Sequence, residues 1–386
     1  MLKIGIVCYP TFGGSGIVAT ELGKALAKKG NEVHFITYSQ PVRLDVFVEN
    51  VYYHEVSIVE YPLFEFAPYE LSLASKLVDV VKHEKLDLLH VHYAIPHAYV
   101  AFMAKQILMQ EGINIPILTT LHGTDITLVG KSELLGPAIS FAINQSDCVT
   151  AVSENLKQET IRSFDIKKNI NVIPNFIDFS EYDVSPDLEL KSIIAPNGEK
   201  ILIHISNFRP VKRVEDVIRI FHILAQDIDA KLIMVGDGPQ RENAEKLSRD
   251  LEIDRQVRFV GKSQDIPRLL GIADLFILPS ETESFGLVAL EAMAAKVPVI
   301  SSNTGGLPEV NINNKTGFTH DVGDVVAMAK SARFILEDAN RLEGFKEEAY
   351  KQAHEFDLQN ILPRYEHWYN SVLDSFKTNG GMDCVE

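Results

Sequence analysis

The sequence predicts an α/β protein built from two Rossmann-like, doubly wound domains, and two observations lead to this prediction. Nearly continuous apolar runs alternate with helical patterns, as expected for parallel strands buried on both faces, and a second series of the same kind starts at Lys200. The chain has 386 residues, which is too long for one ordinary core. We therefore expect an N-terminal domain over residues 1–178 and a C-terminal domain over residues 195–357.

The N-terminal domain begins with the apolar run Leu2–Cys8, a glycine-rich loop at Tyr9–Gly16 and a helical pattern from about Ile17 to Lys29. The loop reads G-G-S-G rather than G-x-G-x-x-G, so the nicotinamide fingerprint is absent. A phosphate-approach loop and a tight turn that needs a positive φ both remain open. The further expected elements are strands at Glu32–Thr37, Val51–Val56, Leu86–His92, Ile117–Leu121 and Cys148–Val152, and helices at Leu71–His83, at Pro96–Gln110 and after the N-cap pair Ser153 and Glu154.

Residues 183–198 lose periodicity and gather proline and charge, which predicts the linker between the domains. The second series follows. Its expected elements are strands at Lys200–Ser206, Lys231–Gly236, Val257–Val260 and Leu275–Leu278, and helices at Val214–Gln226, before Leu251, at Val325–Glu337, at Leu342–Phe356 and at Leu358–Lys377. The last helix places Ile361, Tyr365, Trp368 and Tyr369 on one face, a stripe that is typical of a core.

Composition and charge exclude several classes of function. The formal charge is −16, with most of the deficit after Phe164, so the basic field that nucleic acid requires is missing. No apolar run approaches the roughly 18 residues of a membrane span. Cys8, Cys148 and Cys384 have no pairing or metal-binding spacing, and the start M-L-K-I-G-I-V predicts a strand rather than a signal peptide. We expect a soluble, cytoplasmic protein that binds neither nucleic acid nor membranes.

The stretch Leu275–Val299 organises the C-terminal domain. Its apolar strand stops at Pro279, a polar loop follows, and a helix starts after Gly286. Such a junction lies at the carboxyl edge of an open α/β sheet, where the first N–H groups of a helix favour an anion. Glu283 in the loop and Glu291 in the helix should lie on the order of 10 Å apart, which suits two hydroxyl-bearing parts of one long ligand better than a retaining glycosidase pair. Two solvated acids are the alternative.

The spacing from Glu283 to Glu291 resembles the E-x7-E motif of retaining glycosyltransferases of family four, and Val297–Val310, V-P-V-I-S-S-N-T-G-G-L-P-E-V, is similar to the continuation in that family. The resemblance implies the GT-B fold, in which two Rossmann-like domains face across a cleft. It implies a nucleotide-sugar donor held mainly by the C-terminal domain and an acceptor held mainly by the N-terminal one. It also implies that the last helix, about 358–377, packs back on the N-terminal domain and helps define the hinge.

Cations for the donor diphosphate are expected in Ser206–Arg213, S-N-F-R-P-V-K-R, just after a strand. Lys212 matches the family lysine, but Asn207 stands where the family usually has arginine, so Arg209 is the candidate for that guanidinium. Arg213 could be solvated. By resemblance, the catalytic candidates are Glu283, Lys212 and His122, which would position the hexose. The candidate donor-binding residues are Gly13, Gly14, Asn207, Arg209, Lys212, Ser284, Phe285, Gly286, Leu287 and Glu291.

Histidines gather after two strands of the N-terminal domain. His90 and His92 should share one face of their strand because side chains alternate with period two. A metal site with His97 and His122 is one interpretation. We favour acceptor contacts here and predict no metal site. The candidate acceptor-binding residues are Ser15, Tyr93, His97, Thr119 and Thr124, while Asp125 is expected to order its own loop.

Within the family, H-Y-A-I-P-H-A, L-H-G-T-D-I-T and I-S-N-F-R-P-V-K-R most resemble enzymes that move N-acetylglucosamine from UDP-N-acetylglucosamine to the hydroxyl of L-malate with retention, the first step of bacillithiol formation. This implies a hexosyltransferase that acts on these two small molecules without a further cofactor. A different small acceptor, a UDP-N-acetylglucosamine 2-epimerase and a non-catalytic nucleotide-sugar sensor remain alternatives. The sequence leaves both a monomer and a homo-oligomer open.

Overall fold

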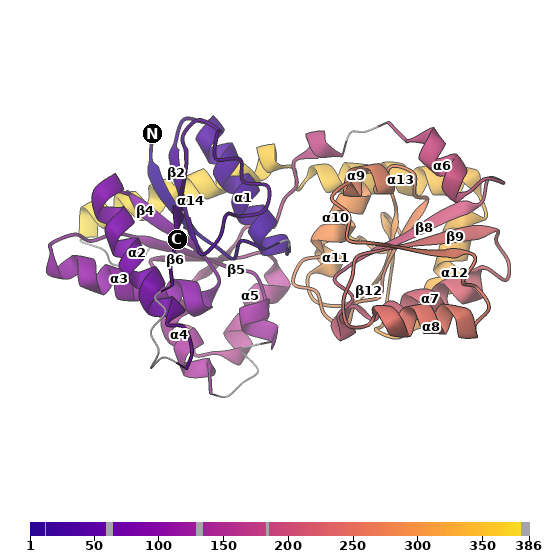
Figure 1. The fold of residues 1–386 in the computed structure, drawn as a ribbon, viewed down its shortest axis with the longest axis horizontal. Coiled ribbons are helices and arrows are strands. Elements are labelled where there is room, and N and C mark those ends of the chain that lie inside the picture. The colour runs from indigo at the N-terminus through magenta and orange to yellow at the C-terminus, as the bar shows by residue number, and fades with distance from the viewer. Residues whose placement is uncertain (12, 59–64, 129–133, 183–184, 380–386) are drawn as a thin grey trace. The chain divides into compact units, whose positions relative to one another are not determined.

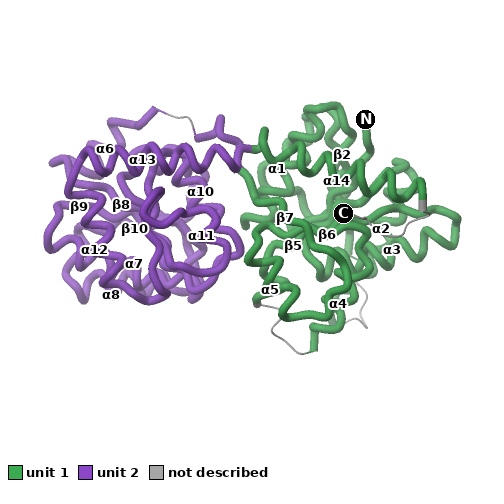
Figure 2. The backbone as a smooth tube through the Cα atoms, turned by 180° about the vertical axis from the view of Figure 1, so that it is seen from behind, with its two compact units in different colours: residues 1–176, 358–386 green, residues 177–357 purple. Residues whose placement is uncertain are grey.

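A computed structural model of the protein describes residues 1–11, 13–58, 65–128, 134–182 and 185–379 (Figure 1). The chain divides into two compact units. Unit 1 comprises Met1–Phe176 and Leu358–Glu386, and unit 2 comprises Ile177–Asp357 (Figure 2). The chain therefore leaves unit 1, completes unit 2 and returns to unit 1.

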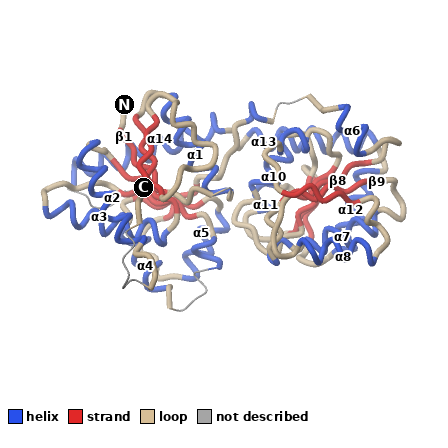
Figure 3. Tube along the Cα trace, viewed as in Figure 1, coloured by secondary structure: helices blue, strands red, loops and turns tan. Residues whose placement is uncertain are grey.

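Unit 1 contains, within its described residues, a parallel sheet of seven strands in the order β3-β2-β1-β4-β5-β6-β7, with helices around it (Figure 3). Strands β4 and β5 are buried along their whole length, as expected for a sheet covered on both faces. The strands are β1 Lys3–Val7, β2 Glu32–Thr37, β3 Val51–Glu55, β4 Leu88–His92, β5 Ile117–Leu121, β6 Cys148–Ala151 and β7 Ile170–Val172. The helices are α1 Gly14–Lys28, α2 Tyr69–Glu84, α3 Tyr99–Gln110, α4 Gly136–Gln145 and α5 Glu154–Ser163, with short π-type turns η1 Ala94–Ala98 and η2 Thr124–Leu128.

Unit 2 repeats this architecture with six described strands in the order β10-β9-β8-β11-β12-β13. Its core includes Phe208, Phe221, Ile277 and Ile300, all fully buried. The strands are β8 Lys200–Ile205, β9 Ala230–Val235, β10 Val257–Gly261, β11 Leu275–Leu278, β12 Val299–Ser302 and β13 Gly317–His320. The helices are α6 Leu188–Ile194, α7 Val214–Leu224, α8 Arg241–Asp250, α9 Ile266–Leu270, α10 Leu287–Ala294, α11 Leu307–Val310, α12 Val325–Leu336 and α13 Ala339–His354, with 3₁₀ turns η4 Phe179–Glu181 and η5 Pro210–Lys212.

Both sheets have the strand order of doubly wound Rossmann folds, so the predicted fold class is confirmed. The unit boundary lies at Phe176, ahead of the expected linker at residues 183–198. Helix α6 occupies seven residues of that segment, of which residues 183 and 184 lie outside the described ones. Asp187 starts α6 because its side chain accepts the Leu190 N–H at 2.8 Å.

The last helix, α14 (Leu358–Asn379), belongs to unit 1 although it follows unit 2 in the sequence. Tyr365 and Tyr369 are buried in the core of unit 1, whereas Trp368 is half-buried. The Tyr369 hydroxyl lies 2.7 Å from Nδ1 of His90 on β4. Most of the predicted aromatic stripe is therefore core. No helix in the described part of the chain has the length and apolar content to span a membrane.

Candidate active site

The loop between β11 and α10 holds Glu283 in a defined position. Lys212 Nζ donates to Glu283 Oε1 in an ion pair, and Ser280 Oγ donates to the same oxygen at 3.0 Å. The Lys212 and Glu283 side chains are only 19% and 13% exposed. Because a carboxylate needs donors and a partly buried ammonium needs an anion, this pair fixes two of the predicted catalytic groups beside the carboxyl ends of β8 and β11.

Two glycines let the backbone around Glu283 pack closely. Gly286, with a φ of 95°, is the N-cap of α10, and a Cβ there would lie 2.5 Å from Cδ2 of Leu307. Gly305 has a φ of 57°, and a Cβ there would lie 1.8 Å from the Glu283 carbonyl oxygen. The Gly306 N–H donates to that same oxygen at 2.9 Å. Gly305 and Gly306, the two glycines of T-G-G, thus support the Glu283 loop. This role was not predicted from the sequence.

At the start of α10, backbone N–H groups are better placed to bind a nucleotide-sugar donor than some of the predicted side chains. Phe285 is buried, and its ring packs edge-to-face against Phe356 at a centroid distance of 5.5 Å. Its side chain is therefore core. Ser284 and Leu287 are half-buried at the helix start. Glu291, the fifth residue of α10, is only 8% exposed, which argues against a solvated helix-surface acid.

The segment after β8 separates its cations into different environments. Arg213 is paired and only partly exposed, because its Nε donates to Asp216 in the first turn of α7 at 2.6 Å. Lys212 is paired with Glu283, as described above. Asn207 and Arg209 are exposed, and Arg209 has no ion pair among the described residues. Arg209 is therefore the guanidinium of this segment that is available to an anionic ligand.

His204 fixes the beginning of the same segment. Its Nδ1 lies 2.8 Å from the Ile277 carbonyl and must carry the proton, so Nε2 can accept from the Ser206 hydroxyl at 2.8 Å. Ser206 Oγ in turn accepts the Phe208 N–H at 3.3 Å. Burial lowers the pKa of His204 to about 4, which keeps this arrangement neutral at pH 7. A single histidine within a strand gives no sequence signal, so His204 is not among the residues predicted from the sequence.

The glycine-rich loop of unit 1 leads directly into α1. Gly13 is the N-cap with a φ of −73°, so a turn that needs a positive φ does not explain this glycine. Among the described residues, a Cβ at Gly13 would meet only the Thr11 hydroxyl, at 3.4 Å. Gly13 and Gly14 are exposed. The exposure of these two glycines is compatible with a phosphate-approach loop, which stays a prediction.

Tyr93, Ser15 and Thr124 come together in unit 1. The Tyr93 hydroxyl donates to Ser15 Oγ at 2.7 Å. Burial raises the pKa of Tyr93 to about 12, and the hydroxyls of Ser15 and Thr124 oppose this rise. Tyr93 also has a φ of 87°, a conformation that costs a non-glycine residue about 1–3 kcal/mol and is concentrated at functional sites.

Asp125 ties the Tyr93 segment to its own loop. Its Oδ2 accepts the Ala94 N–H at 2.7 Å and its Oδ1 accepts the Gly123 N–H at 3.2 Å. Burial raises the pKa of Asp125 to about 6, against the effect of these N–H donors. These contacts agree with the predicted role of Asp125 in ordering its loop.

His90, His92, His97 and His122 form a buried, connected group. His92 Nδ1 lies 2.7 Å from His122 Nε2, His97 Nδ1 lies 2.6 Å from the His92 carbonyl, and His90 Nε2 lies 2.8 Å from the Thr120 hydroxyl. Burial lowers the pKa of all four imidazoles, to about 3 for His90 and His122 and to about 4 for His97. Within the described residues these histidines do not gather three ligand atoms as a metal requires.

Two predicted acceptor residues lie in the interior. Thr119 is fully buried in β5, and its hydroxyl lies 2.7 Å from that of Ser146. Because side chains alternate along a strand, Thr119 points away from the face that carries Thr120. His97 is also fully buried, and its Nε2 has no partner among the described residues. The structure thus groups Ser15, Tyr93 and Thr124 but does not bring Thr119 to them.

Comparisons with known proteins agree with this architecture. Residues 12–181 match the model described as Glycosyltransferase Family 4, and residues 187–352 match the one described as Glycosyl transferases group 1. A relative, the N-acetyl-alpha-D-glucosaminyl L-malate synthase of Bacillus anthracis, is 47% identical over 96% of this chain and 97% of that protein. An uncharacterized glycosyltransferase of Methanocaldococcus jannaschii is 29% identical over 97% of this chain and 99% of that protein.

Solved structures show the same fold. Anabaena HepE, solved in complex with UDP-glucose, has a TM-score of 0.82 at 21% identity, covering 96% of this chain and 100% of that one. Sucrose-phosphate synthase from Thermosynechococcus elongatus has a TM-score of 0.79 at 21% identity, covering 97% of this chain and 100% of that one. Together with the family models and the 47% identical relative, they establish that this chain belongs to the family-four glycosyltransferases of the GT-B type.

Proposed function

We propose that this glycosyltransferase moves N-acetylglucosamine from UDP-N-acetylglucosamine to the hydroxyl of L-malate with retention at the anomeric carbon, the first step of bacillithiol formation. The observation that carries the proposal is the 47% identity, over nearly the whole chain, to an enzyme named as an N-acetyl-alpha-D-glucosaminyl L-malate synthase. The three segments that resembled such enzymes include Tyr93, His122 and Lys212. Tyr93 and His122 directly follow strands β4 and β5, and Lys212 ends the 3₁₀ turn η5 in the segment after β8.

Unit 2 provides the groups that we assign to the donor. A diphosphate needs local positive charge in a chain whose formal charge is −16. Lys212, the exposed Arg209 and the first N–H groups of α10 supply it. We assign Glu283 to the transferred sugar and Glu291 to the ribose hydroxyls, because carboxylates accept hydrogen bonds from vicinal hydroxyls.

The proposed chemistry needs neither a protein nucleophile nor a cofactor. The bond from the anomeric carbon to the diphosphate oxygen breaks, a bond to the malate hydroxyl oxygen forms on the same face, and the hydroxyl proton passes to the leaving diphosphate. Lys212 stabilises the charge that develops on UDP. His122 is neutral because burial lowers its pKa to about 3, so we assign it to positioning the hexose rather than to proton transfer.

Unit 1 provides hydroxyl groups for a small polar acceptor. Ser15, Tyr93 and Thr124 lie together, and Ser15 and Thr124 are at least partly accessible. Hydroxyl donors suit the carboxylates of malate, which must be held while the malate hydroxyl meets the anomeric carbon.

The test incubates the full chain with UDP-N-acetylglucosamine and, in parallel, L-malate, D-malate, lactate or inositol phosphate. Mass spectrometry should show an L-malate conjugate formed one-to-one with UDP, and NMR should show the α linkage. Transfer to another acceptor but not to malate would overturn the acceptor assignment alone. Release of a free 2-epimer from the donor would identify an epimerase, and UDP binding without turnover would identify a sensor.

A further inference from the structure

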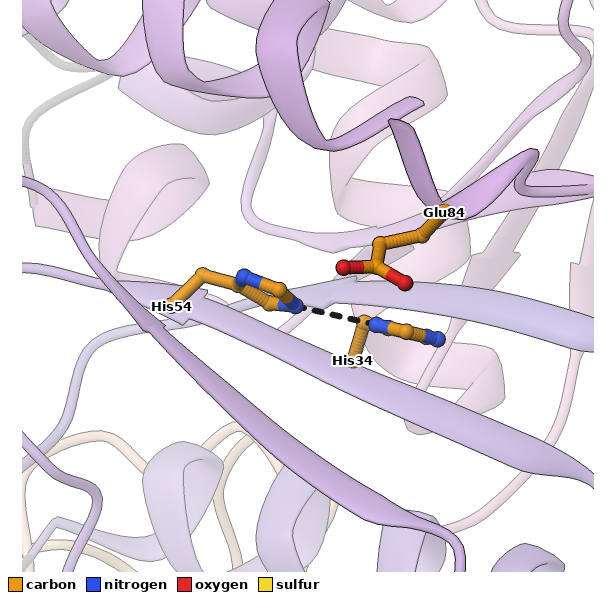
Figure 4. Close-up of side chains that lie close together, drawn as sticks. All are labelled: His34, His54 and Glu84. Carbon is orange, nitrogen blue, oxygen red and sulfur yellow. Dashed lines mark hydrogen bonds between the residues drawn. The ribbon is translucent and has the colours of Figure 1, made fainter. Parts of the chain in front are cut away.

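A second group of polar side chains lies in unit 1 apart from the residues assigned to the reaction: His34, His54 and Glu84 (Figure 4). We propose that these three residues bind a divalent transition-metal ion, expected to be zinc, and that the ion fastens edge strand β3 to β2 and α2. No motif or spacing in the sequence marks these residues, and the sequence predicts no metal site. The proposal is independent of the transferase reaction.

The backbone brings the three ligands together from three elements. In the parallel pairing of β2 with β3, Ile36 lies opposite His54, so His34 and His54 stand on the same face of the sheet. Glu84 is the last residue of α2. Nδ1 of His34 lies 2.9 Å from Nε2 of His54, and one ligand atom from each of the three residues lies within 4.8 Å of the others. Figure 4 shows the carboxylate facing these two nitrogens.

The donor set matches the coordination chemistry of zinc. Two nitrogens on a tetrahedral zinc ion, at bonds of about 2.0–2.1 Å, lie about 3.4 Å apart, so a small opening of the histidine pair admits the ion. Without an ion, the facing nitrogens must share one proton. An ion would replace that proton and give both lone pairs a partner. Two imidazoles with one carboxylate favour zinc over calcium or magnesium, which prefer oxygen ligands, and leave a fourth position for water.

The proposed ligands lie in a partly enclosed environment that contains charged groups. His34 is fully buried and stacks on Tyr52 at a centroid distance of 4.7 Å. Glu84 and Asp79 favour positive charge at His54, and Lys76 opposes it.

The lack of a hydrogen-bond partner at His34 Nε2 limits the metal affinity that we expect. When Nδ1 of His34 binds the ion, its proton must sit on Nε2, which has no partner among the described residues. Loss of such an outer partner typically weakens metal affinity by about 10–100-fold. We therefore expect weaker binding than at a closed structural zinc site.

The ion would act on a part of the sheet that has few other constraints. Strand β3 lies at the edge of the seven-stranded order and pairs only with β2 among the described strands. A metal that binds the folded state but not the unfolded chain raises thermal stability by mass action. The expected consequence is a more stable unit 1, with no change in the transferase chemistry.

In the experiment, the chelator-stripped full chain is titrated with CoCl₂ while the visible absorption of Co²⁺ is followed. ZnCl₂ is then added to displace Co²⁺. The Tm is recorded with and without each metal. One ion per chain and a metal-dependent rise in Tm are expected. His54→Gln and Glu84→Gln should each weaken binding by about 10–100-fold or more and remove the rise in Tm. Both positions are partly exposed, so the metal-free Tm of each variant can establish that it folds.

His83→Gln is the matched control. His83 precedes Glu84 in α2, is 75% exposed and pairs with Asp79, so it reports binding at the helix surface alone. This variant should bind Co²⁺ as the unsubstituted chain does. The proposal is overturned if the unsubstituted chain binds no Co²⁺, or if His54→Gln and Glu84→Gln both bind it with unchanged affinity.

Discussion

At Glu283, one carboxylate pairs with Lys212 and, in the proposed complex, contacts the transferred sugar. Glu283→Gln keeps the size of the side chain and removes its charge. We expect kcat/KM for UDP-N-acetylglucosamine to fall by about 10²-fold or more, while the Kd of UDP changes little, because the sugar contact strengthens in the transition state. Steady-state kinetics and UDP calorimetry measure the two quantities.

The control for this variant is Glu281→Gln. Glu281 lies in the same loop and is exposed. Its replacement should leave both kcat/KM and the Kd of UDP unchanged. Normal turnover in Glu283→Gln would remove Glu283 from the site.

Tyr93 and Thr119 were both predicted as acceptor contacts. Because their surroundings in the structure differ, we expect substitutions at these two residues to have different effects. Tyr93→Phe removes a hydroxyl that lies against Ser15, and should raise the KM of L-malate more than that of the donor. Thr119→Val removes a buried hydroxyl bonded to Ser146, and should lower the free energy of unfolding by about 1–3 kcal/mol with the malate KM unchanged. Kinetics at saturating donor and urea denaturation test this contrast, and a reversed pattern would place Thr119 in the site.

At the scale of elements, the loop before α10 depends on the segment after β12. Gly305→Ala would place a Cβ 1.8 Å from the Glu283 carbonyl oxygen at a φ of 57°. The loop must then shift, so we expect a loss of kcat/KM together with a lower Tm. Gly344→Ala is the matched control because a Cβ there meets nothing within 4 Å inside α13, and it should stabilise the protein by about 0.5–1 kcal/mol. Unchanged activity in Gly305→Ala would show that this support is dispensable.

The sequence predicted most strands of the two alternating series, and it missed short elements that contain polar or charged residues. Strands β2, β5 and β11 have the predicted bounds because each is a short run rich in β-branched and other apolar residues that is bounded by loop-forming residues. Strands β12 and β13 were not predicted; each has only four residues and includes polar side chains. Helix α6 was predicted as linker because it is short, charged and started by one capping side chain.

The same limit applies to the candidate site. Glu283, Glu291 and Lys212 lie in local motifs and could be selected from the sequence. Gly305 and His204 could not, because their roles come from contacts between segments that only the fold brings together. Likewise, no spacing in the sequence joins the histidines of β2 and β3 to the end of α2.

At the scale of the whole molecule, buried neutral histidines link stability to pH. His90, His97 and His122 have pKa values of about 3 to 4 in the fold, below about 6.5 in the unfolded chain. Below pH 6.5 the unfolded chain therefore binds more protons, and stability falls as pH falls, by up to about 1.4 kcal/mol per pH unit for each histidine. Asp125, whose pKa is raised to about 6, acts in the opposite sense as a single group.

We therefore expect the urea midpoint of unit 1 to decrease from pH 7.5 to pH 5. The only tryptophan of the chain, Trp368, lies on α14 of unit 1, so its fluorescence can report this unit. A midpoint that stays constant or rises on acidification would contradict neutral burial of these histidines.

The return of the chain to unit 1 through α14 has a consequence for synthesis on the ribosome. Tyr365 and Tyr369 fill the core around β4, yet they emerge only after residues 177–357 have been made. At about 5–20 residues per second, that interval lasts roughly 10–40 s. Unit 2 can fold during this time, while the sheet of unit 1 still lacks α14 and leaves an apolar face exposed to solvent. The half that is translated first should therefore finish folding last, and nascent chains that stop before Leu358 should be the ones that chaperones retain.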